Sequence, residues 1–262
     1  MELPCLTRFD RTPERQLLIR RLASATILDE AEREALISLP MLVRDFADGQ
    51  DLVRGGDRPQ HCCVLLSGFA CRYLLLADGR RQIAAFHPPG DIPDLQSLHL
   101  QVMDHSVGAM MPTVAGFIQH EHVHRITSQH PRLIHAFWRE TLIDAAIFRA
   151  WMVGLGRRTA HERIAHLICE MLLRFDAVGL AENRTFRMPV TQNDIADALG
   201  LSNVHVNRVL QDLRRDELIS WQRPDVAILD WDRLRDLAMF DPAYLHMRSL
   251  PGAGAAEPGE EH

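Results

Sequence analysis

The fold of this chain is decided by residues 192–211, QNDIADALGLSNVHVNRVLQ. The spacing of the apolar residues predicts two short helices, each with one apolar stripe that can be buried only against the other. The stripes consist of Ile195, Ala196 and Leu199 in the first helix and of Val206, Val209, Leu210 and Leu213 in the second. The small Ala196 allows a close crossing, as in the helix-turn-helix motif that places its second helix in the DNA major groove. The stretch therefore favours a DNA-binding motif over an ordinary helical hairpin.

The sequence also contains capping signals at the ends of these helices. Thr191 followed by Asp194 is a capping pattern that begins the first helix, and Gly200 can adopt the left-handed conformation that ends it. Ser202 is expected to cap the second helix. These signals agree with the two stripes over one short span.

Length and composition bound the class of protein. The chain has 262 residues, enough for two modest domains or one large one. A content of 47% hydrophobic and 24% charged residues is typical of a soluble globular protein. No apolar run approaches the roughly 20 residues of a membrane helix, and the N-terminus lacks a signal-peptide core. We therefore expect a cytoplasmic protein with no membrane partner.

The charge pattern points to a local DNA contact. The net charge of −6 argues against a generally basic nucleic-acid binder, so any contact must come from a patch. All 29 basic residues are arginine, which favours bidentate contacts to phosphate or guanine.

The five cysteines form a scattered set without Cys-x-x-Cys pairs or zinc spacing: Cys5, Cys62, Cys63, Cys71 and Cys169. Reduced, mostly buried thiols are expected. The neighbouring pair Cys62 and Cys63 could alternatively be redox-sensitive.

The first half of the chain changes from helical to strand patterns. Residues 1–38 contain amphipathic helical material, and the polar positions of the acid-rich residues 29–39 suit a solvated face. From about residue 42 to residue 118, short apolar runs alternate with glycine turns. Strands are predicted over residues 62–66, 71–76, 82–86 and 113–118. This spacing indicates a small antiparallel barrel or jelly roll, which could close around a ligand or be a filled scaffold.

Residues 131–156 are expected to form one long helix of about 37 Å. Its heptad seam is continuous and consists of Ile134, Trp138, Thr141, Ala145, Phe148, Met152 and Leu155. This heptad period predicts a partner helix, so a symmetric dimer is favoured over a core helix buried on two sides within one chain. A second stripe, formed by Leu133, Phe137, Ile147 and Trp151, is left to pack on the barrel.

The remaining elements surround the helix-turn-helix. Gly154 and Gly156 predict a hinge before a helix over residues 159–175, which Gly179 follows. Residues 185–190 are a strand candidate. Residues 218–222 and 226–229 are expected to pair as a wing, and Asp230 to cap a last helix. The sequence thus predicts an α+β chain with a barrel domain over residues 1–130, a dimerisation helix over 131–156, a winged helix-turn-helix domain over 157–248 and a disordered tail over 249–262.

This order of elements resembles the Crp/Fnr superfamily of bacterial transcription regulators over about residues 40–240. The resemblance is strongest in VTQNDIADALGLSNVHVNRVLQDLRRDELI, which looks like the DNA-binding signature of the family. The segment HPPGDI resembles the entry to its nucleotide-binding cassette. The resemblance implies a cyclic-nucleotide-binding-like barrel and a homodimer that binds double-stranded DNA at a two-fold symmetric site.

The cyclic AMP ligands of that family are not matched. The resemblance calls for a glutamate after the Gly-Asp pair, where Leu95 stands with Asp94 beside it, and for an Arg-Ser or Arg-Thr pair, where His105 and Ser106 stand. Asp94 would repel a phosphate, and a neutral histidine cannot replace a guanidinium fork. Cyclic AMP binding is therefore not expected. The cysteine cluster of the oxygen-sensing branch is also missing from the first 40 residues, which contain Cys5 alone.

Three histidines, His120, His122 and His124, offer an alternative function. In a strand all three share a face, and in a helix the first and third do so, which suits a metal- or haem-dependent sensor or a cupin-like metalloprotein. The glutamate and glycine that a cupin needs do not follow them. We therefore expect no metal and no cofactor, and solvated histidines on a short surface helix.

The second helix of the motif supplies the candidate DNA contacts, which are Ser202, Asn203, Val204, His205, Asn207, Arg208, Gln211 and Arg215. With its stripe turned inward, Val204, Arg208, Gln211 and Arg215 point outward. Arg208 is the natural donor to a guanine, an asparagine could pair with adenine, and Val204 suits a thymine methyl group. Relatives with a glutamate at this position are expected to select cytosine, so Val204 predicts a different half-site. Arg214 and Arg215 add positive charge.

We therefore expect a sequence-specific transcriptional regulator rather than an enzyme. It would act as a homodimer with two recognition helices about one DNA turn apart. A signal in the barrel would shift the seam, or the regulator would be constitutive and controlled by its abundance. RNA polymerase is a further partner to consider, and the residues specify neither the effector nor activation or repression.

Overall fold

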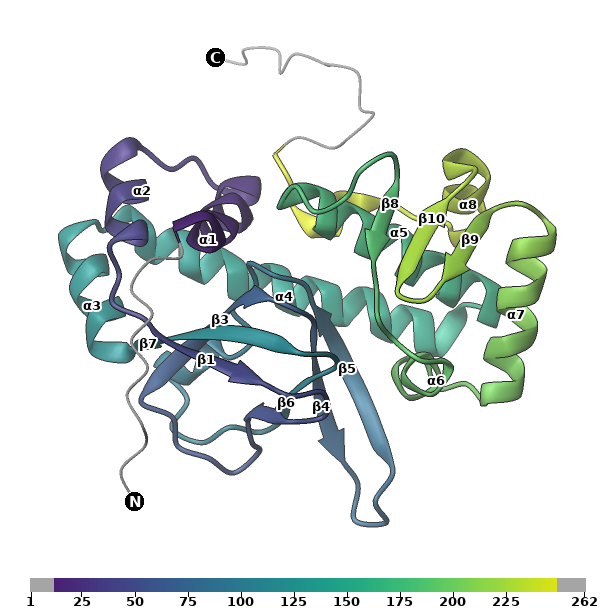
Figure 1. Cartoon of the computed structure of the whole chain (residues 1–262), viewed down its shortest axis with the longest axis horizontal. Coiled ribbons are helices and arrows are strands. Elements are labelled where there is room, and N and C mark those ends of the chain that lie inside the picture. The colour runs from purple at the N-terminus through teal and green to yellow at the C-terminus, as the bar shows by residue number, and fades with distance from the viewer. Residues whose placement is uncertain (1–11, 249–262) are drawn as a thin grey trace.

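The computed structural model describes residues 12–248, which form a β-rich region, one long helix and a C-terminal region of helices and short strands (Figure 1). The first part contains α1 (Thr12–Ala25), α2 (Glu30–Ile37), β1 (Leu42–Phe46), β2 (Asp51–Val53), β3 (His61–Ser67), β4 (Ala70–Leu75), β5 (Arg81–His87), the 3₁₀ helix η1 (Leu95–Leu98), β6 (Ser106–Ala109) and β7 (Thr113–Gln119). The second part contains α3 (His120–Gln129), α4 (Arg132–Arg157), α5 (Ala160–Ala177), β8 (Thr185–Arg187), α6 (Gln192–Leu199), α7 (Asn203–Arg215), β9 (Ile219–Gln222), β10 (Asp225–Ile228), α8 (Trp231–Ala238) and the 3₁₀ helix η2 (Pro242–Leu245).

The β-rich region is a pair of antiparallel sheets with a filled interior. One sheet has the strand order β1-β7-β3 and the other β2-β6-β4-β5. Apolar side chains of both sheets, among them Leu65, Val107 and Phe117, form one core between them. The predicted jelly roll is confirmed. Its interior is packed with side chains, as in the filled-scaffold alternative.

Three strands were not predicted, namely β1, β2 and β6. Strand β2 has only three residues, and β6 contains a glycine in the run SVGA, so neither shows an alternation long enough to recognise. Strand β1 carries charged Arg44 and Asp45 in its centre and pairs in full register with β7. Pairing with a central strand therefore decides its structure.

The two N-terminal helices cover one end of the barrel, and α1 packs on both β3 and α4 (Figure 1). One prediction for this region is wrong. Glu32 in the acid-rich segment is buried and not solvated, because its side chain accepts the backbone N–H of Asp29 in a capping box that begins α2.

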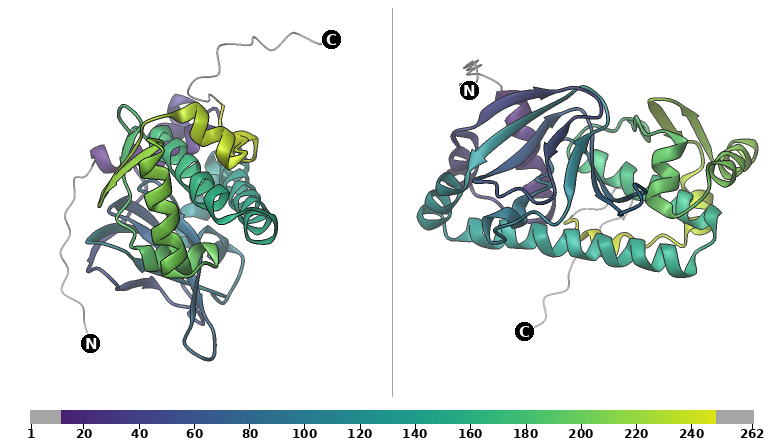
Figure 2. Two further views of the ribbon diagram at one scale, coloured as in Figure 1. Left: turned by 90° about the vertical axis from the view of Figure 1, so that its right-hand side faces the viewer. Right: turned by 90° about the horizontal axis from the view of Figure 1, so that it is seen from below.

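Helix α4 runs along one side of the molecule, from α3 to the helix-turn-helix (Figure 2, right). Its predicted second stripe is buried against the barrel as expected: Leu133 and Phe137 share a core with β3 and the N-terminal helices, and Ile147 and Trp151 share one with β5 and α5. The predicted hinge at Gly154 and Gly156 is wrong. The helix continues through both glycines to Arg157, and the chain turns at extended Arg158, since a capping box between Thr159 and Glu162 begins α5 there.

The C-terminal region is a winged helix-turn-helix. Strand β10 pairs with β9 and with β8, and in this three-stranded sheet β9 contacts α7 while β8 contacts α5. The capping predictions are confirmed for α6, for α7 and for α8, which Asp230 caps. Gly179 follows α5 in the left-handed conformation, with φ of +73°.

Some predictions lie outside the described residues, namely those for Cys5 and for the tail over residues 249–262. Among residues 12–248, no helix combines the length and the apolar character needed to cross a membrane.

Candidate DNA-binding interface

The two helices of the motif are locked in place by local interactions. Thr191 and Asp194 form the capping box of α6, and Gly200 ends that helix with φ of +61° and ψ of +43°. The Ser202 hydroxyl accepts the backbone N–H of His205 at 3.3 Å and begins α7. Both predicted apolar stripes are buried. The prediction that the stripes can be buried only against each other is wrong, because α5 packs on both helices and its apolar residues join the same core. The orientation of α7 therefore follows from packing against α5 as well as α6.

The outward face of α7 is open to solvent, as predicted from the helical period. Val204, Arg208, Gln211 and Arg215 are all exposed, and Val204 is 82% accessible. An apolar β-branched side chain that is this exposed at the start of a helix is unfavourable in water. It is suited to contact with a partner surface.

The polar candidates differ in how free they are. Within residues 12–248, the Arg208 guanidinium makes no hydrogen bond or ion pair, so it is available to a base edge. Asn207 donates from Nδ2 to Gln192 Oε1 at 3.2 Å, which fixes it against α6. Ser202 and Asn203 are exposed and His205 is half-buried at the same end of the helix.

The predicted basic patch is weaker than the sequence suggests. Arg215 is paired with Asp212 at 2.8 Å and with Asp216 at 3.1 Å, and these carboxylates raise the pKa of Arg215. Arg214 donates to the carbonyl oxygen of Trp221 in the wing at 3.0 Å. Asp216, just past α7, therefore adds a second carboxylate to the one that Asp212 supplies within the helix. Arg208 is the least neutralised cation of the outward face.

The predicted dimer seam is uncovered in the single chain. Ile134, Trp138, Met152 and Leu155 are exposed, with Trp138 60% and Met152 65% accessible, while Thr141, Ala145 and Phe148 are half-buried. Exposed Leu142 and Val153 widen the same face. An apolar stripe of this length on one helix is typical of a surface that is buried by association.

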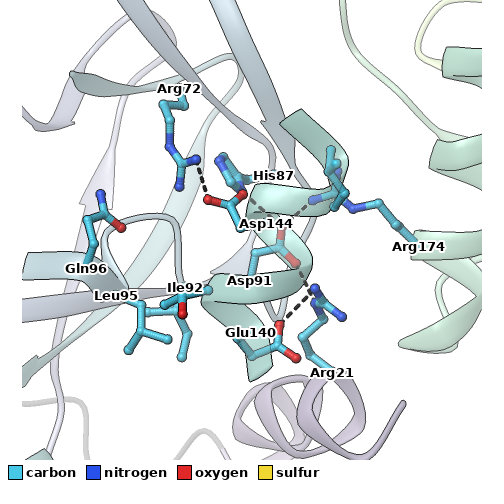
Figure 3. Close-up of a pocket in the computed structure, with 12 residues that line it drawn as sticks. Arg21, Arg72, His87, Asp91, Ile92, Leu95, Gln96, Glu140, Asp144 and Arg174 are labelled. Carbon is cyan, nitrogen blue, oxygen red and sulfur yellow. Dashed lines mark hydrogen bonds and ion pairs between the residues drawn. The ribbon is translucent and has the colours of Figure 1, made fainter. Parts of the chain in front are cut away.

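A buried cluster of charges lies where the barrel, α1, α4 and α5 meet (Figure 3). Asp91 is at its centre and pairs with Arg174 of α5 at 2.6 Å and with Arg21 of α1 at 3.1 Å. Arg21 also reaches Glu140 of α4 at 2.8 Å, and Arg72 of β4 reaches Asp144 of α4 at 2.6 Å. The sequence reasoning missed this cluster, because no spacing along the chain connects these residues.

The cluster shifts the protonation of its members. Burial alone would raise the pKa of Asp91, but Arg174, His87 and Arg21 outweigh it and hold that pKa well below its usual range. Burial raises the pKa of Glu140 to about 7 and lowers the pKa of His87 to about 4. The cluster therefore contains neutral His87 and a Glu140 that titrates near neutral pH.

The region that resembles a nucleotide-binding cassette is occupied by the protein itself. Asp94 is fully buried and accepts the backbone N–H of Cys63 at 2.7 Å, and Leu95 is buried beside it. Ser106 accepts the N–H of Gly55, and His105 lies 2.7 Å from Asp104. The cavity at the charge cluster measures about 30 Å³. A small-molecule site usually needs at least roughly 300 Å³.

The histidines of the alternative hypothesis lie on a surface helix, as expected. His120 begins α3 and its Nε2 lies 3.0 Å from the Ser97 hydroxyl, while His124 is exposed. Within the described part of the chain, no three His, Cys, Asp or Glu side chains gather closely enough to hold a metal ion. The four described cysteines are free and buried, and burial raises the pKa of both Cys62 and Cys63. Neither cysteine is therefore poised as a thiolate.

Comparison with known proteins identifies both parts of this architecture. Residues 43–130 match the family described as cyclic nucleotide-binding domain, and residues 162–237 match the family described as Crp-like helix-turn-helix domain. The nitrogen fixation regulation protein FixK of Bradyrhizobium diazoefficiens is 32% identical over 222 residues, covering 84% of this chain and 91% of that protein. The transcriptional activator protein Anr of Pseudomonas protegens is 29% identical over 211 residues, covering 80% and 86%.

Solved structures of regulators from the same family share this fold. FixK2 from Bradyrhizobium japonicum superposes with a TM-score of 0.69 at 25% identity, and the match covers 76% of this chain and 98% of that one. A Crp-family regulator from Thermus thermophilus shares the fold, with a TM-score of 0.57 at 24% identity over 75% of this chain and 97% of that one. On this evidence, the chain belongs to the Crp/Fnr family of DNA-binding transcriptional regulators.

Proposed function

We propose that the protein is a sequence-specific regulator that acts as a homodimer and reads a two-fold symmetric DNA site with α7. The observation that carries this proposal is the outward face of α7, where exposed Val204 stands beside Arg208, whose guanidinium has no partner among residues 12–248. A guanidinium and a methyl-bearing side chain on one helix face match the guanine edge and the thymine methyl group of the major groove. Ser202, Asn203, His205, Asn207, Gln211 and Arg215 complete the proposed contact set, with Arg215 restricted by its two carboxylates.

Dimerisation through α4 is the second part of the proposal. The seam from Ile134 to Leu155 is apolar, exposed or half-buried, and in heptad register. Two chains joined in this way would present two recognition helices about one DNA turn apart. The last residue of the seam, Leu155, lies close to the turn of the motif, because a Cβ added at Gly200 would lie 3.4 Å from its Cδ2.

Selection of bound fragments from a random DNA pool tests binding, symmetry and half-site together. We expect an inverted repeat without the bases that a glutamate at position 204 would select. Arg208→Ala should weaken binding by about 1–3 kcal/mol and relax one base position. An equal loss on every sequence in competition binding would instead make Arg208 a phosphate contact.

The seam is tested by Trp138→Asp in the full chain. Two buried aspartates facing each other across a two-fold axis carry a large desolvation cost, so the variant should sediment as a monomer. Glu121→Asp on exposed α3 serves as a control that should leave the sedimentation unchanged. A Trp138→Asp variant that stays dimeric would refute the seam.

We further propose that the barrel does not bind cyclic AMP. The cassette segment is filled by buried Asp94 and Leu95, and His105 stands where the resemblance calls for an arginine. Calorimetric titration of the purified protein with cyclic AMP should show no binding, and a dissociation constant in the micromolar range would contradict this proposal.

A further inference from the structure

Strand β5 is connected to the DNA-binding region at both of its ends, at one end through Asp91 and at the other directly. At its last residue, His87 lies 3.0 Å from Asp91, which pairs with Arg174 of α5. At its first residue, Arg81 reaches across to α6, the first helix of the motif. The second connection belongs neither to the proposed DNA contacts nor to the seam.

Arg81 holds two carboxylates of α6 at once. Its Nη2 lies 2.5 Å from Asp194 Oδ1, and its Nε lies 2.9 Å from Asp197 Oδ2. The exposed fractions of the three side chains lie between 13% and 34%, so water screens these pairs less than it screens a surface pair. Because the guanidinium is planar, two acids at fixed nitrogens define a direction as well as a distance.

The two oxygens of Asp194 have separate tasks. Oδ2 accepts the backbone N–H and the hydroxyl of Thr191, at 2.8 and 2.7 Å, and so begins α6. Oδ1 is left for Arg81. At the other end of the helix, Gln82 of β5 donates from Nε2 to the carbonyl oxygen of Ala198 at 3.2 Å. Strand β5 therefore holds both the first and the last turn of α6.

A movement of α6 would carry the recognition helix with it. The apolar stripes of α6 and α7 belong to one buried core, and Arg163 of α5 donates to the carbonyl oxygen of Leu199 at 2.9 Å. The angle between α6 and the barrel thus sets the angle of α7. In a dimer, this angle determines the distance and rotation between the two recognition helices.

We propose that Arg81 is a positioning residue that fixes the spacing between the two DNA half-sites read by the dimer. This proposal rests on the proposed function, since it concerns how two copies of α7 are held. Arg81 does not touch DNA in this arrangement. It acts by clamping α6 to the barrel through Asp194 and Asp197.

The experiment compares DNA sites that differ only in half-site spacing. The inverted repeat obtained by selection is remade with one base pair inserted or removed at its centre, which shifts a half-site by about 3.4 Å and rotates it by about 35°. The full-length wild-type protein should lose at least about fivefold in affinity on each altered site, and Arg81→Ala at most about twofold. The base preference within each half-site should be the same for both proteins, because α7 is intact.

Matched variants separate the clamp from general effects of charge and folding. Arg80→Ala removes the neighbouring arginine, which pairs only with Asp78 of its own hairpin within the described residues, and should behave like wild type. Arg81→Lys keeps the charge without the fork and should be intermediate. Asp197→Asn should likewise widen the range of half-site spacings that the protein tolerates. Adding it to Arg81→Ala should have little further effect, since both substitutions remove the same interaction.

The outcomes are distinct. If wild type selects no DNA, the proposed function fails. If wild type selects a symmetric site but Arg81→Ala and Asp197→Asn keep the wild-type spacing ratio with unchanged thermal unfolding, the proposal for Arg81 is overturned and the proposed function stands. A wild-type protein that binds sites of all three spacings equally would also overturn the proposal for Arg81.

Discussion

The buried charge cluster allows a prediction of stability from a single substitution, Arg174→Met. The Arg174 side chain is 5% exposed and pairs with Asp91 at 2.6 Å and with Glu170 at 3.2 Å. Methionine is unbranched and fills much of the same space without a charge. Packing is therefore largely kept, while two buried carboxylates each lose one of their partners. Asp91 keeps Arg21 and His87, and Glu170 keeps the Trp151 indole and the Tyr244 hydroxyl.

The expected loss lies at the lower end of the range for a broken buried pair, because each carboxylate retains other donors. We expect a decrease of about 3 kcal/mol in the free energy of unfolding. For a domain of this size the midpoint of thermal unfolding should fall by roughly 6–12 °C. The loss should shrink at low pH, since an unpaired buried carboxylate binds a proton more readily and then carries no charge.

Urea unfolding followed by circular dichroism at pH 7 and at pH 5 measures this effect. Arg54→Ala is the control, because the Arg54 side chain is 72% exposed where it pairs with half-buried Asp51, and its loss should cost less than about 1 kcal/mol. A loss below about 1 kcal/mol for Arg174→Met would refute the view that the cluster is held by its ion pairs.

Two further predictions concern protonation and backbone conformation. Burial raises the pKa of Glu140 from the ordinary 4.5 to about 7 in the folded chain, so its contribution to stability should be complete below pH 4.5 and be lost as the pH rises to 7. Glu140→Gln should flatten that part of the stability profile measured by urea unfolding, and an unchanged slope would contradict the assignment. Gly200→Ala places a side chain at φ of +61° and 3.4 Å from Leu155 Cδ2, so it should lower the stability by about 1–2 kcal/mol and weaken DNA binding in a mobility-shift assay, while Gly156→Ala in exposed α4 should be neutral or stabilising.

The motif and the long helix could be predicted because their signals are local. A capping box, a left-handed glycine and a stripe at helical spacing each span only a few residues, so Thr191, Gly200 and Val206 carry their own structural information. Strand β1 has no such signal, since its centre is polar and it forms through its partner β7. The same holds for Arg158, where the capping box of the next helix, rather than the nearby glycines, ends α4.

The charge cluster could not be predicted because its members are far apart in the sequence. Arg21, Asp91 and Arg174 come from three parts of the chain, and each is of a residue type that is normally solvated. Only the fold shows that they meet at a place where all three side chains are buried. For Arg81, likewise, the sequence shows one of two adjacent arginines and does not distinguish the one that clamps α6.

The composition of the cluster bears on how the regulator is controlled. Three arginines, Arg21, Arg72 and Arg174, meet four carboxylates, Asp91, Glu140, Asp144 and Glu170, and the pKa of about 7 for Glu140 allows this excess of one negative charge to be removed by one proton. The contacts between barrel, α4 and α5 are therefore balanced without a charged ligand. We propose on this basis that no anionic effector is needed to join these parts. If so, adding small anions from a cell extract should leave the DNA affinity of the purified protein unchanged, and an increase on adding them would show that the cluster takes an anionic ligand.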